Sequence, residues 1–217
     1  MYATLVWATP DLDKHLAYIA RVSNPENQAN KKIEWLLRYM EREGHYSPFE
    51  MANVCIEINT PRDIMRQILR HKSMPPQEFS QRYQTVDKLG NFVEREFRLQ
   101  HPTNRQASID VPEDDPRQIE WRRRQQRLLD IVKEDYEWCL ANGGAKEVAR
   151  VILPEGLTPS RAYFNGNMRS WIFYLKSRLH ESTQKEHRLV AQDVLKVLKE
   201  VAPVTMNAFF NDETETE

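Results

Sequence analysis

The pattern of hydrophobic and polar positions predicts a chain of interspersed helices and strands. Met51 to Thr60 alternates and is rich in β-branched residues, which favours a strand. From Glu26 to Glu43 apolar residues recur every three or four positions, as in an amphipathic helix, and Gly44 is suited to end it. Residues 116–141 indicate a longer amphipathic helix. The other expected elements are strands at 3–7, 92–99 and 160–165 and helices at 11–19, 61–69, 145–151, 168–178 and 183–201.

Residues 71–84 fit neither periodicity. The segment is polar and contains Pro75-Pro76, which suits neither the interior of a helix nor a central strand, so an ordered loop with a function is expected. Residues 100–114 are predicted to form a second polar loop. Helices separated by non-adjacent strands favour a single α+β domain, with a small antiparallel or mixed sheet flanked by helices. This domain is expected to span residues 1–211, and acidic residues 212–217 to form a disordered tail.

Composition narrows the class of protein. The 217 residues are 40% apolar and 29% charged, and no apolar run reaches the ~18 residues of a membrane span. The N-terminus has no basic stretch before an apolar block, so the cytoplasm, or the host cytoplasm for a viral protein, is the expected compartment. Cys55 and Cys139 have no CxxC partner, which argues against a disulfide framework or a thiolate zinc site.

Charge is unevenly distributed along the chain. The net charge is only −1, from 31 basic and 32 acidic residues, which argues against a globally basic nucleic-acid binder. Residues 60–84 nevertheless carry five basic and two acidic side chains, and residues 165–191 carry the same numbers. Two zones of +3 on a nearly neutral chain indicate a small anionic ligand.

The first basic zone places three arginines on one helical face. Arg62, Arg66 and Arg70 recur every four residues, a spacing at which like charges repel by a few tenths of a kcal/mol per pair, about 0.2–0.5. Asp63 relieves that repulsion only in part, and a bound phosphate would offset the rest. The alternative is that the three arginine side chains extend into solvent and bind nothing. The segment from Arg70 to Tyr83 then adds arginine, glutamate, glutamine and serine side chains without a single glycine.

The segment from Arg70 to Tyr83 resembles the signature of the flavin-dependent thymidylate synthases (ThyX family). That signature is Arg-His-Arg, a gap of seven residues, and Ser-x-Arg-Tyr. Lys72 replaces the arginine at the third position of Arg-His-Arg, and Pro75-Pro76 interrupts a stretch of small residues. The matching positions are Arg70, His71, Ser80, Arg82 and Tyr83, and further blocks in family order are Ile19 to Ser23, Glu43 to Glu50, Ala149 to Pro154 and Arg169 to His187.

The resemblance implies a specific reaction and assembly. The family methylates C5 of dUMP with 5,10-methylenetetrahydrofolate, using a hydride that NADPH delivers to FAD. It holds FAD between the subunits of a homotetramer with shared active sites, which agrees with the absence of a GxGxxG motif from a chain with six glycines. Neither cysteine has a local basic group to make it nucleophilic, so both are expected in the core.

The resemblance also implies the site residues. Arg178 is expected to polarise the uracil, because an arginine four residues after Tyr174 places a cation on an aromatic helix face; packing on Trp171 is the alternative. His45 is expected near flavin and folate, whereas Phe173 stands where many members have a polar flavin contact and is excluded. The dUMP positions are Gln67, Arg70, Glu78, Ser80, Gln81, Arg82, Arg150 and Arg178. The FAD positions are Ser47, Arg70, His71, Lys72, Glu78, Asn167 and Arg169.

Two alternatives stay open at this point. A ThyX-like paralogue would transfer another one-carbon unit, such as hydroxymethyl, to a deoxypyrimidine nucleotide, and Lys72 with Pro75-Pro76 motivates that alternative. A non-enzymatic nucleic-acid-binding protein would use the first basic zone and the run Arg122 to Arg124, although a solvated helix face explains that run better. No metal site is expected, because His180 and His187 lack an HExxH motif and a third ligand.

Overall fold

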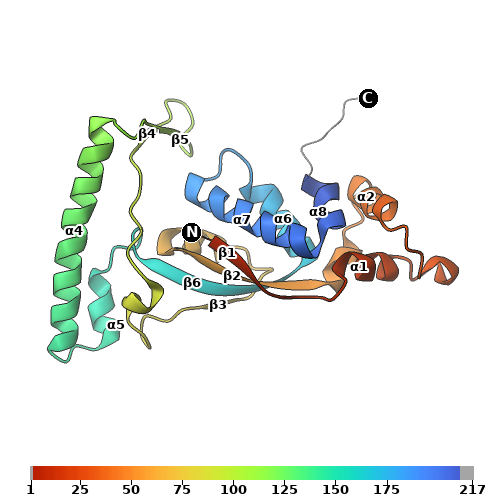
Figure 1. The fold of residues 1–217 in the computed structure, drawn as a ribbon, viewed down its shortest axis with the longest axis horizontal. Coiled ribbons are helices and arrows are strands. Elements are labelled where there is room, and N and C mark those ends of the chain that lie inside the picture. The colour runs from red at the N-terminus through yellow and green to blue at the C-terminus, as the bar shows by residue number, and fades with distance from the viewer. Residues whose placement is uncertain (1, 211–217) are drawn as a thin grey trace.

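The centre of the protein is an antiparallel β-sheet (Figure 1). The computed structural model describes residues 2–210, so the tail expected at 212–217 lies outside the described residues. Helices and this sheet form one α+β unit, which confirms the expected fold class. The sheet has four strands, in the spatial order β1 (Tyr2–Ala8), β2 (Asn53–Pro61), β6 (Pro159–Asn167) and β3 (Pro76–Glu78).

The two central strands, β2 and β6, pair over their full length. The register runs through nine residue pairs, from Asn53 opposite Asn167 to Pro61 opposite Pro159. Ile56 lies opposite Phe164 and both side chains are fully buried, as the alternation of a half-covered antiparallel sheet requires. The sequence therefore predicted both central strands correctly, to within two residues at their ends.

The edge strand β3 lies inside the segment expected as a loop. Pro76 pairs opposite Phe164 on β6, and the main-chain N–H of Asn165 donates to the carbonyl of Pro75 at 3.2 Å. A proline removes one ladder donor, which an edge strand tolerates and a central strand does not. The prolines therefore end the sheet on this side and hold the loop against β6.

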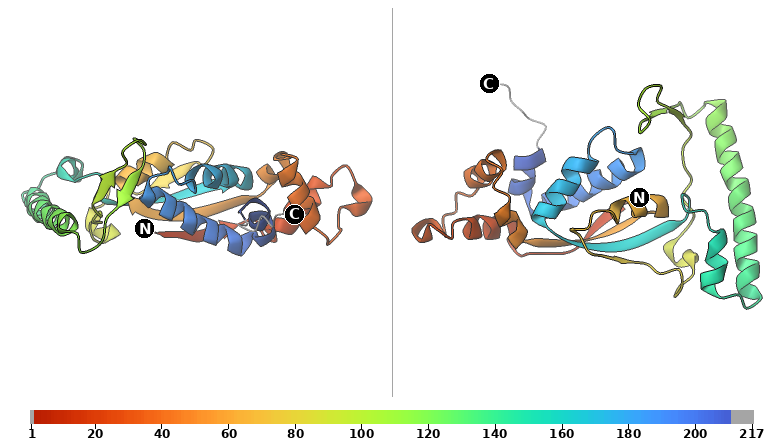
Figure 2. Two further views of the ribbon diagram at one scale, coloured as in Figure 1. Left: turned by 90° about the horizontal axis from the view of Figure 1, so that it is seen from above. Right: turned by 180° about the vertical axis from the view of Figure 1, so that it is seen from behind.

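Helices cover one face of the sheet (Figures 1 and 2). The core between them is apolar, and Trp171, the largest fully buried side chain, donates its indole N–H to the carbonyl of Val54 at 3.0 Å. At Gly166 a Cβ atom would stand 2.9 Å from both the Trp171 indole nitrogen and Met74 Cγ, so only glycine fits this approach. The helices that pack on the sheet are α6 (Met168–Arg178), α7 (Lys185–Val201) and α3 (Arg62–Ile68). At one end of the sheet, α1 (Leu12–Ala20) and α2 (Glu34–Arg42) pack against α8 (Pro203–Phe210).

A long helix stands apart from this body at one end of the molecule (Figure 1). It is α4 (Pro116–Ala141), followed by the short α5 (Lys146–Ala149). A hairpin of β4 (Arg98–Gln100) and β5 (Ser108–Asp110) precedes α4, so the loop expected at 100–114 contains a strand. No described helix combines the length and apolar composition that a membrane crossing demands.

Helix boundaries differ from expectation at two places. The helix expected from Glu26 begins only at Glu34, because the guanidinium of Arg21 donates to the carbonyls of Asn30 and Lys32 at 2.6 and 2.7 Å and holds them in a loop. Helix α8 was not expected. Short 3-10 turns occupy Pro25–Asn27, Ser47–Met51, Val86–Leu89 and Arg150–Ile152.

The start of α8 is capped from a distant helix. Asp13 on α1 is buried, and its carboxylate accepts from the main-chain N–H of Val204 at 2.8 Å and of Thr205 at 3.0 Å. The hydroxyl of Thr205 also donates to it at 2.5 Å. This carboxylate thus performs for α8 the function of a local N-cap, which explains how the C-terminal helix docks.

We therefore expect Asp13→Ala to destabilise the protein by about 2 kcal/mol, since the buried donors of α8 lose their acceptor. Thermal unfolding followed by circular dichroism should show a melting temperature lower by about 4–8 °C. Glu200→Ala removes an exposed carboxylate from the neighbouring α7 and is the matched control. Equal melting temperatures for the two variants would contradict the capping role.

Candidate functional site

The C-terminal end of α6 meets the loop that follows α3. Arg178 Nε donates to Nε2 of His71 at 3.0 Å, and the His71 ring stands edge-on to buried Tyr174 at 5.0 Å between centroids. None of the cation–π contacts within residues 2–210 involves Arg178, so it does not pack on Trp171 in the way the alternative required. The Arg178 side chain is instead held by its hydrogen bond to the His71 imidazole.

His71 is a neutral acceptor for this arginine. Burial, together with the charges of Arg178 and Arg70, lowers the pKa of His71 to about 4. Since this folded-state pKa lies below the ordinary value of about 6.5, the unfolded chain binds the proton more tightly. The stabilising contribution of neutral His71 is complete above about pH 6.5 and is lost as the pH falls toward 4. Near neutral pH His71 is therefore an uncharged partner of the Arg178 guanidinium.

The expected stripe of three arginines is partly neutralised by acids from elsewhere in the chain. Glu78 on β3 lies 3.6 Å from Arg62 and 3.5 Å from Arg66, and it accepts from the hydroxyl of Ser160 at 2.8 Å. Arg66 also pairs with Glu155 at 3.1 Å. Arg70 lies beyond the end of α3 and is exposed.

The Ser-x-Arg-Tyr segment lies against α5. Arg82 Nε contacts Glu147 at 2.9 Å, and Lys146 donates to the carbonyl of Tyr83 at 2.9 Å. Ser80 Oγ accepts from the main-chain N–H of Arg82 at 3.3 Å, while Gln81 is buried with its amide nitrogen unpaired within the described chain. Arg150 begins the 3-10 turn after α5. The contacts thus tie this second group of predicted dUMP residues to α5 rather than to α6.

Two of the predicted flavin residues, Asn167 and Arg169, line a cleft of about 520 Å³ at the start of α6. Asn167 caps α6 by accepting from the N–H of Ser170 at 2.9 Å, and Arg169 pairs with Glu50. Arg169 also lies over the ring of Phe173 at 5.7 Å, so Phe173, excluded by sequence, forms part of the wall. Exposed Lys72 directly precedes Ser73, which also lines the cleft. The Arg169 guanidinium, the Asn167 amide and the Phe173 ring in this wall suit a phosphorylated aromatic group such as a flavin nucleotide.

Two further predicted residues, His45 and Ser47, precede the cleft residue Glu50 in the sequence. Ser47 is exposed at the start of the 3-10 turn that carries Glu50. His45 is also exposed, and its ring stands edge-on to Tyr39 at 5.7 Å between centroids. Both are therefore accessible to a ligand.

Sequence reasoning missed several wall and support residues. Glu50 lies within a matched sequence block, and Phe173 follows Arg169 by one helical turn, so spacing could have indicated both. Gln184 and His187, by contrast, support the predicted residue Gln67 from more than a hundred residues away. No local sequence pattern predicts that contact.

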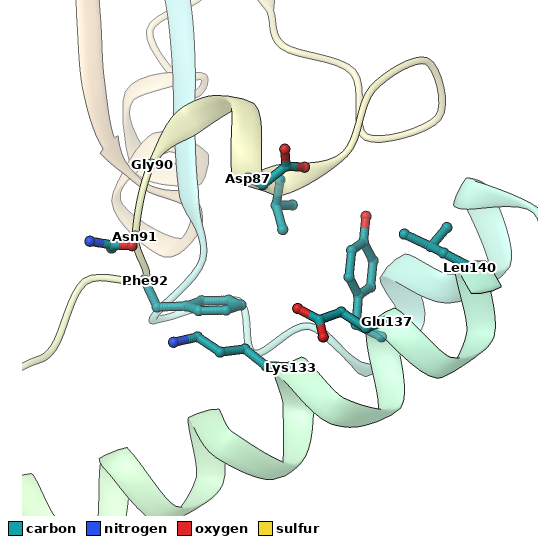
Figure 3. Close-up of a pocket in the computed structure, with 9 residues that line it drawn as sticks. Asp87, Gly90, Asn91, Phe92, Lys133, Glu137 and Leu140 are labelled. Atoms are coloured by element: carbon teal, nitrogen blue, oxygen red, sulfur yellow. The ribbon is translucent and has the colours of Figure 1, made fainter.

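A separate pocket lies between α4 and the 3-10 turn at Val86–Leu89 (Figure 3). Its volume is about 300 Å³, and Phe92, Lys133, Tyr136 and Glu137 are among its lining residues. It contains none of the residues that the sequence singles out, so it is not part of the candidate site.

Comparison with known proteins identifies the family. The family model described as thymidylate synthase complementing protein (Thy1) matches residues 4–204. A probable flavin-dependent thymidylate synthase of Paramecium bursaria Chlorella virus 1 is 46% identical over 174 residues, 79% of this chain and 78% of the relative. A flavin-dependent thymidylate synthase of Synechocystis sp. is 42% identical over 193 residues, 89% and 87% of the two chains.

A solved structure shares the fold. The UMP/dUMP methylase of Streptomyces cacaoi, bound with 5-Br dUMP, superposes with a TM-score of 0.79 at 27% identity, covering 95% of this chain and 93% of the other. The family model spans nearly all of the described chain, and within the signature His71 contacts Arg178 on α6 and Arg82 contacts Glu147 on α5. The chain therefore belongs to the family of flavin-dependent thymidylate synthases.

Proposed function

We propose that the protein catalyses the reductive C5-methylation of dUMP to dTMP, with 5,10-methylenetetrahydrofolate as carbon donor and NADPH as reductant of FAD. The observation that carries the proposal is the hydrogen bond between Arg178, which is expected to act on the pyrimidine, and His71, which is expected to contact the flavin. The two free thiols, Cys55 and Cys139, are compatible with the cytoplasm, where we place the reaction.

Arg178 is proposed to activate the uracil. Its guanidinium would stabilise negative charge that develops at N3 and the carbonyl oxygens, so that C5 becomes nucleophilic without an enzyme thiolate. Burial raises the pKa of Cys55, which keeps that thiol protonated and argues against a cysteine nucleophile. Because His71 is neutral and accepts from Nε, the other guanidinium nitrogens of Arg178 remain for the substrate.

The dUMP phosphate is proposed to bind the remaining cations of the signature. Ser80, Arg82 and Arg150 form one group at α5, whereas Gln67 and Arg178 belong to the group at the end of α6. Since no hydrogen bond or ion pair between residues 2–210 joins these groups directly, a complete site is proposed to combine residues of neighbouring subunits. Arg70, Glu78 and Gln81 complete the set of proposed dUMP contacts.

The cleft at the start of α6 is proposed to hold FAD. Lys72 and Arg169 would contact its phosphates, and Ser47 and Asn167 would donate or accept hydrogen bonds at its rim. When bound, the flavin supplies the hydride. Lys72 keeps the charge of the family's arginine but loses its planar fork, so it would act as a point charge. Arg70, His71 and Glu78 are the remaining proposed flavin contacts, with His45 toward the folate.

A homotetramer is proposed because α4 presents a row of apolar side chains to solvent. Ile131 and Trp138 are 53% and 67% exposed, and Ile119, Trp121 and Leu128 are exposed as well. Apolar surface on this scale along one helix favours burial against another chain. Val132 and Tyr136 on the same helix are buried, and Tyr136 packs with Val86 and Ala149.

The first test is reconstitution. Purified protein is expected to absorb at flavin wavelengths or to take up added FAD, and then to convert dUMP, methylenetetrahydrofolate and NADPH to a nucleotide heavier by about 14 mass units, one CH₂ by formula. UMP serves as a parallel substrate because the structural neighbour is a UMP/dUMP methylase. A product heavier by about 30 mass units would indicate hydroxymethyl transfer instead. Colourless protein that binds no FAD would overturn the proposal.

Arg178→Ala is expected to lower dTMP formation by a factor of about 10²–10³, the usual loss when one stabilising donor is removed. FAD content, measured from the visible spectrum, should stay at the wild-type level, because the proposed contact is with uracil. Arg38→Ala, which removes an exposed arginine from α2, is the control. Loss of FAD without a separate catalytic defect would refute the assignment of Arg178.

For the assembly, light scattering is expected to give four times the 25.8 kDa mass of one chain. Replacing both Ile131 and Trp138 with glutamate should produce smaller species, since charges would be buried at the interface. Gln126→Glu adds one charge to an exposed position on the same helix and should leave the mass unchanged. A monomeric wild-type protein at micromolar concentration would rule out the tetramer.

A further inference from the structure

A chain of hydrogen bonds from α7 holds the side chain of Gln67. Gln67 Nε2 donates to Gln184 Oε1 at 2.7 Å, and Gln184 Nε2 donates to Glu186 Oε2 at 3.0 Å. On the other side, His187 Nδ1 lies 3.2 Å from Gln67 Oε1. Gln184 occupies the N-cap position of α7, yet its side chain makes no capping hydrogen bond and turns toward Gln67 instead.

The carboxylate of Glu186 sets the direction of this chain. An ionised carboxylate accepts hydrogen bonds and donates none, so the amide nitrogen of Gln184 must face it. The Gln184 oxygen then faces Gln67 and requires a donor there, which fixes the orientation of the Gln67 amide. Gln67 Oε1 consequently faces His187, and that imidazole must carry its proton on Nδ1.

Glu186 is well placed to serve as the fixed end. It is buried, and it accepts from Arg98 at 2.7 Å and pairs with Arg95 at 3.2 Å. Burial by itself would raise the pKa of Glu186, but the hydrogen bond from Arg98 and the charges of both arginines outweigh it and hold the pKa below its usual value. The carboxylate therefore stays ionised near neutral pH.

The other end of the chain adjoins the Arg178 group. His187 is fully buried, and burial with the nearby charges of Arg178 and His71 lowers its pKa to about 3, so it is neutral. The Tyr174 ring lies between the two imidazoles, 5.0 Å from His71 and 5.8 Å from His187 between centroids. Gln67 therefore stands beside the residues proposed to meet the uracil end of dUMP.

We propose that Gln184 and His187 are positioning residues for dUMP. They leave the Gln67 carboxamide with one N–H and one oxygen lone pair, in a fixed orientation, for the polar groups of the bound nucleotide. The carboxamide cannot flip without breaking both supporting bonds, so the nucleotide meets an arranged donor and acceptor. This inference rests on the proposed function, in which Gln67 contacts dUMP.

The test is dUMP binding to the FAD-loaded protein by isothermal titration calorimetry. Gln184→Met keeps an unbranched side chain of similar length but removes both polar atoms. It should weaken dUMP binding about tenfold, the loss of one net hydrogen bond. FAD content and kcat at saturating dUMP should stay within about twofold of wild type, because Arg178 is untouched. Gln192→Met makes the same change at an exposed position of α7 and is the control.

Two further variants separate positioning from folding. His187→Asn places an amide N–H where Nδ1–H lies and should bind dUMP more tightly than His187→Leu, which has no donor. In a Gln67→Met background, Gln184→Met should cost nothing more, because the group it positions is gone. Additive losses, or unchanged dUMP affinity in Gln184→Met, would overturn the proposal. Wild-type protein that fails to bind dUMP would instead overturn the proposed function.

Discussion

The pairing of β2 with β6 is the constraint on which the rest of the structure depends. Each strand runs directly into a helix, β2 into α3 and β6 into α6, and the antiparallel register places the two helix starts at opposite ends of the sheet. The N–H of Arg62 bonds the carbonyl of Thr158 at one end, and the N–H of Met168 bonds that of Ala52 at the other. Both helices then return over the same pair of strands.

The lengths of the strands and helices explain why the C-terminal ends of α3 and α6 meet. Nine residues of strand extend about 30 Å, whereas seven and eleven residues of helix together extend about 27 Å. The end of α3 and the end of α6 therefore arrive at nearly the same place, and His71 can contact Arg178. One register thus fixes a contact between residues 107 positions apart in the sequence.

The sequence predicted the parts of this arrangement that have local causes. The central strands and the helices at 168–178 and 185–201 follow from periodicity, and the signature residues were identifiable by type and order. Strands β3 and β5 were not predictable, because three-residue strands exist only through pairing with a distant partner. Likewise α8 depends on Asp13, and the support of Gln67 depends on α7 packing beside α3. The neutralisation of Arg66 and Arg82 by Glu155 and Glu147 also appears only in three dimensions, so local charge counts overstate the cations that are free.

Gly166 shows how narrow the tolerance of this arrangement is. The chain has no glycine-rich phosphate loop, yet this one glycine lets the indole of Trp171 and the side chain of Met74 approach β6 together. Trp171 belongs to the helix that carries Arg178, and Met74 to the loop between His71 and the edge strand. A single added methyl group at Gly166 would clash with both elements at once, so geometry restricts substitution at a residue that is not among the predicted ligand contacts.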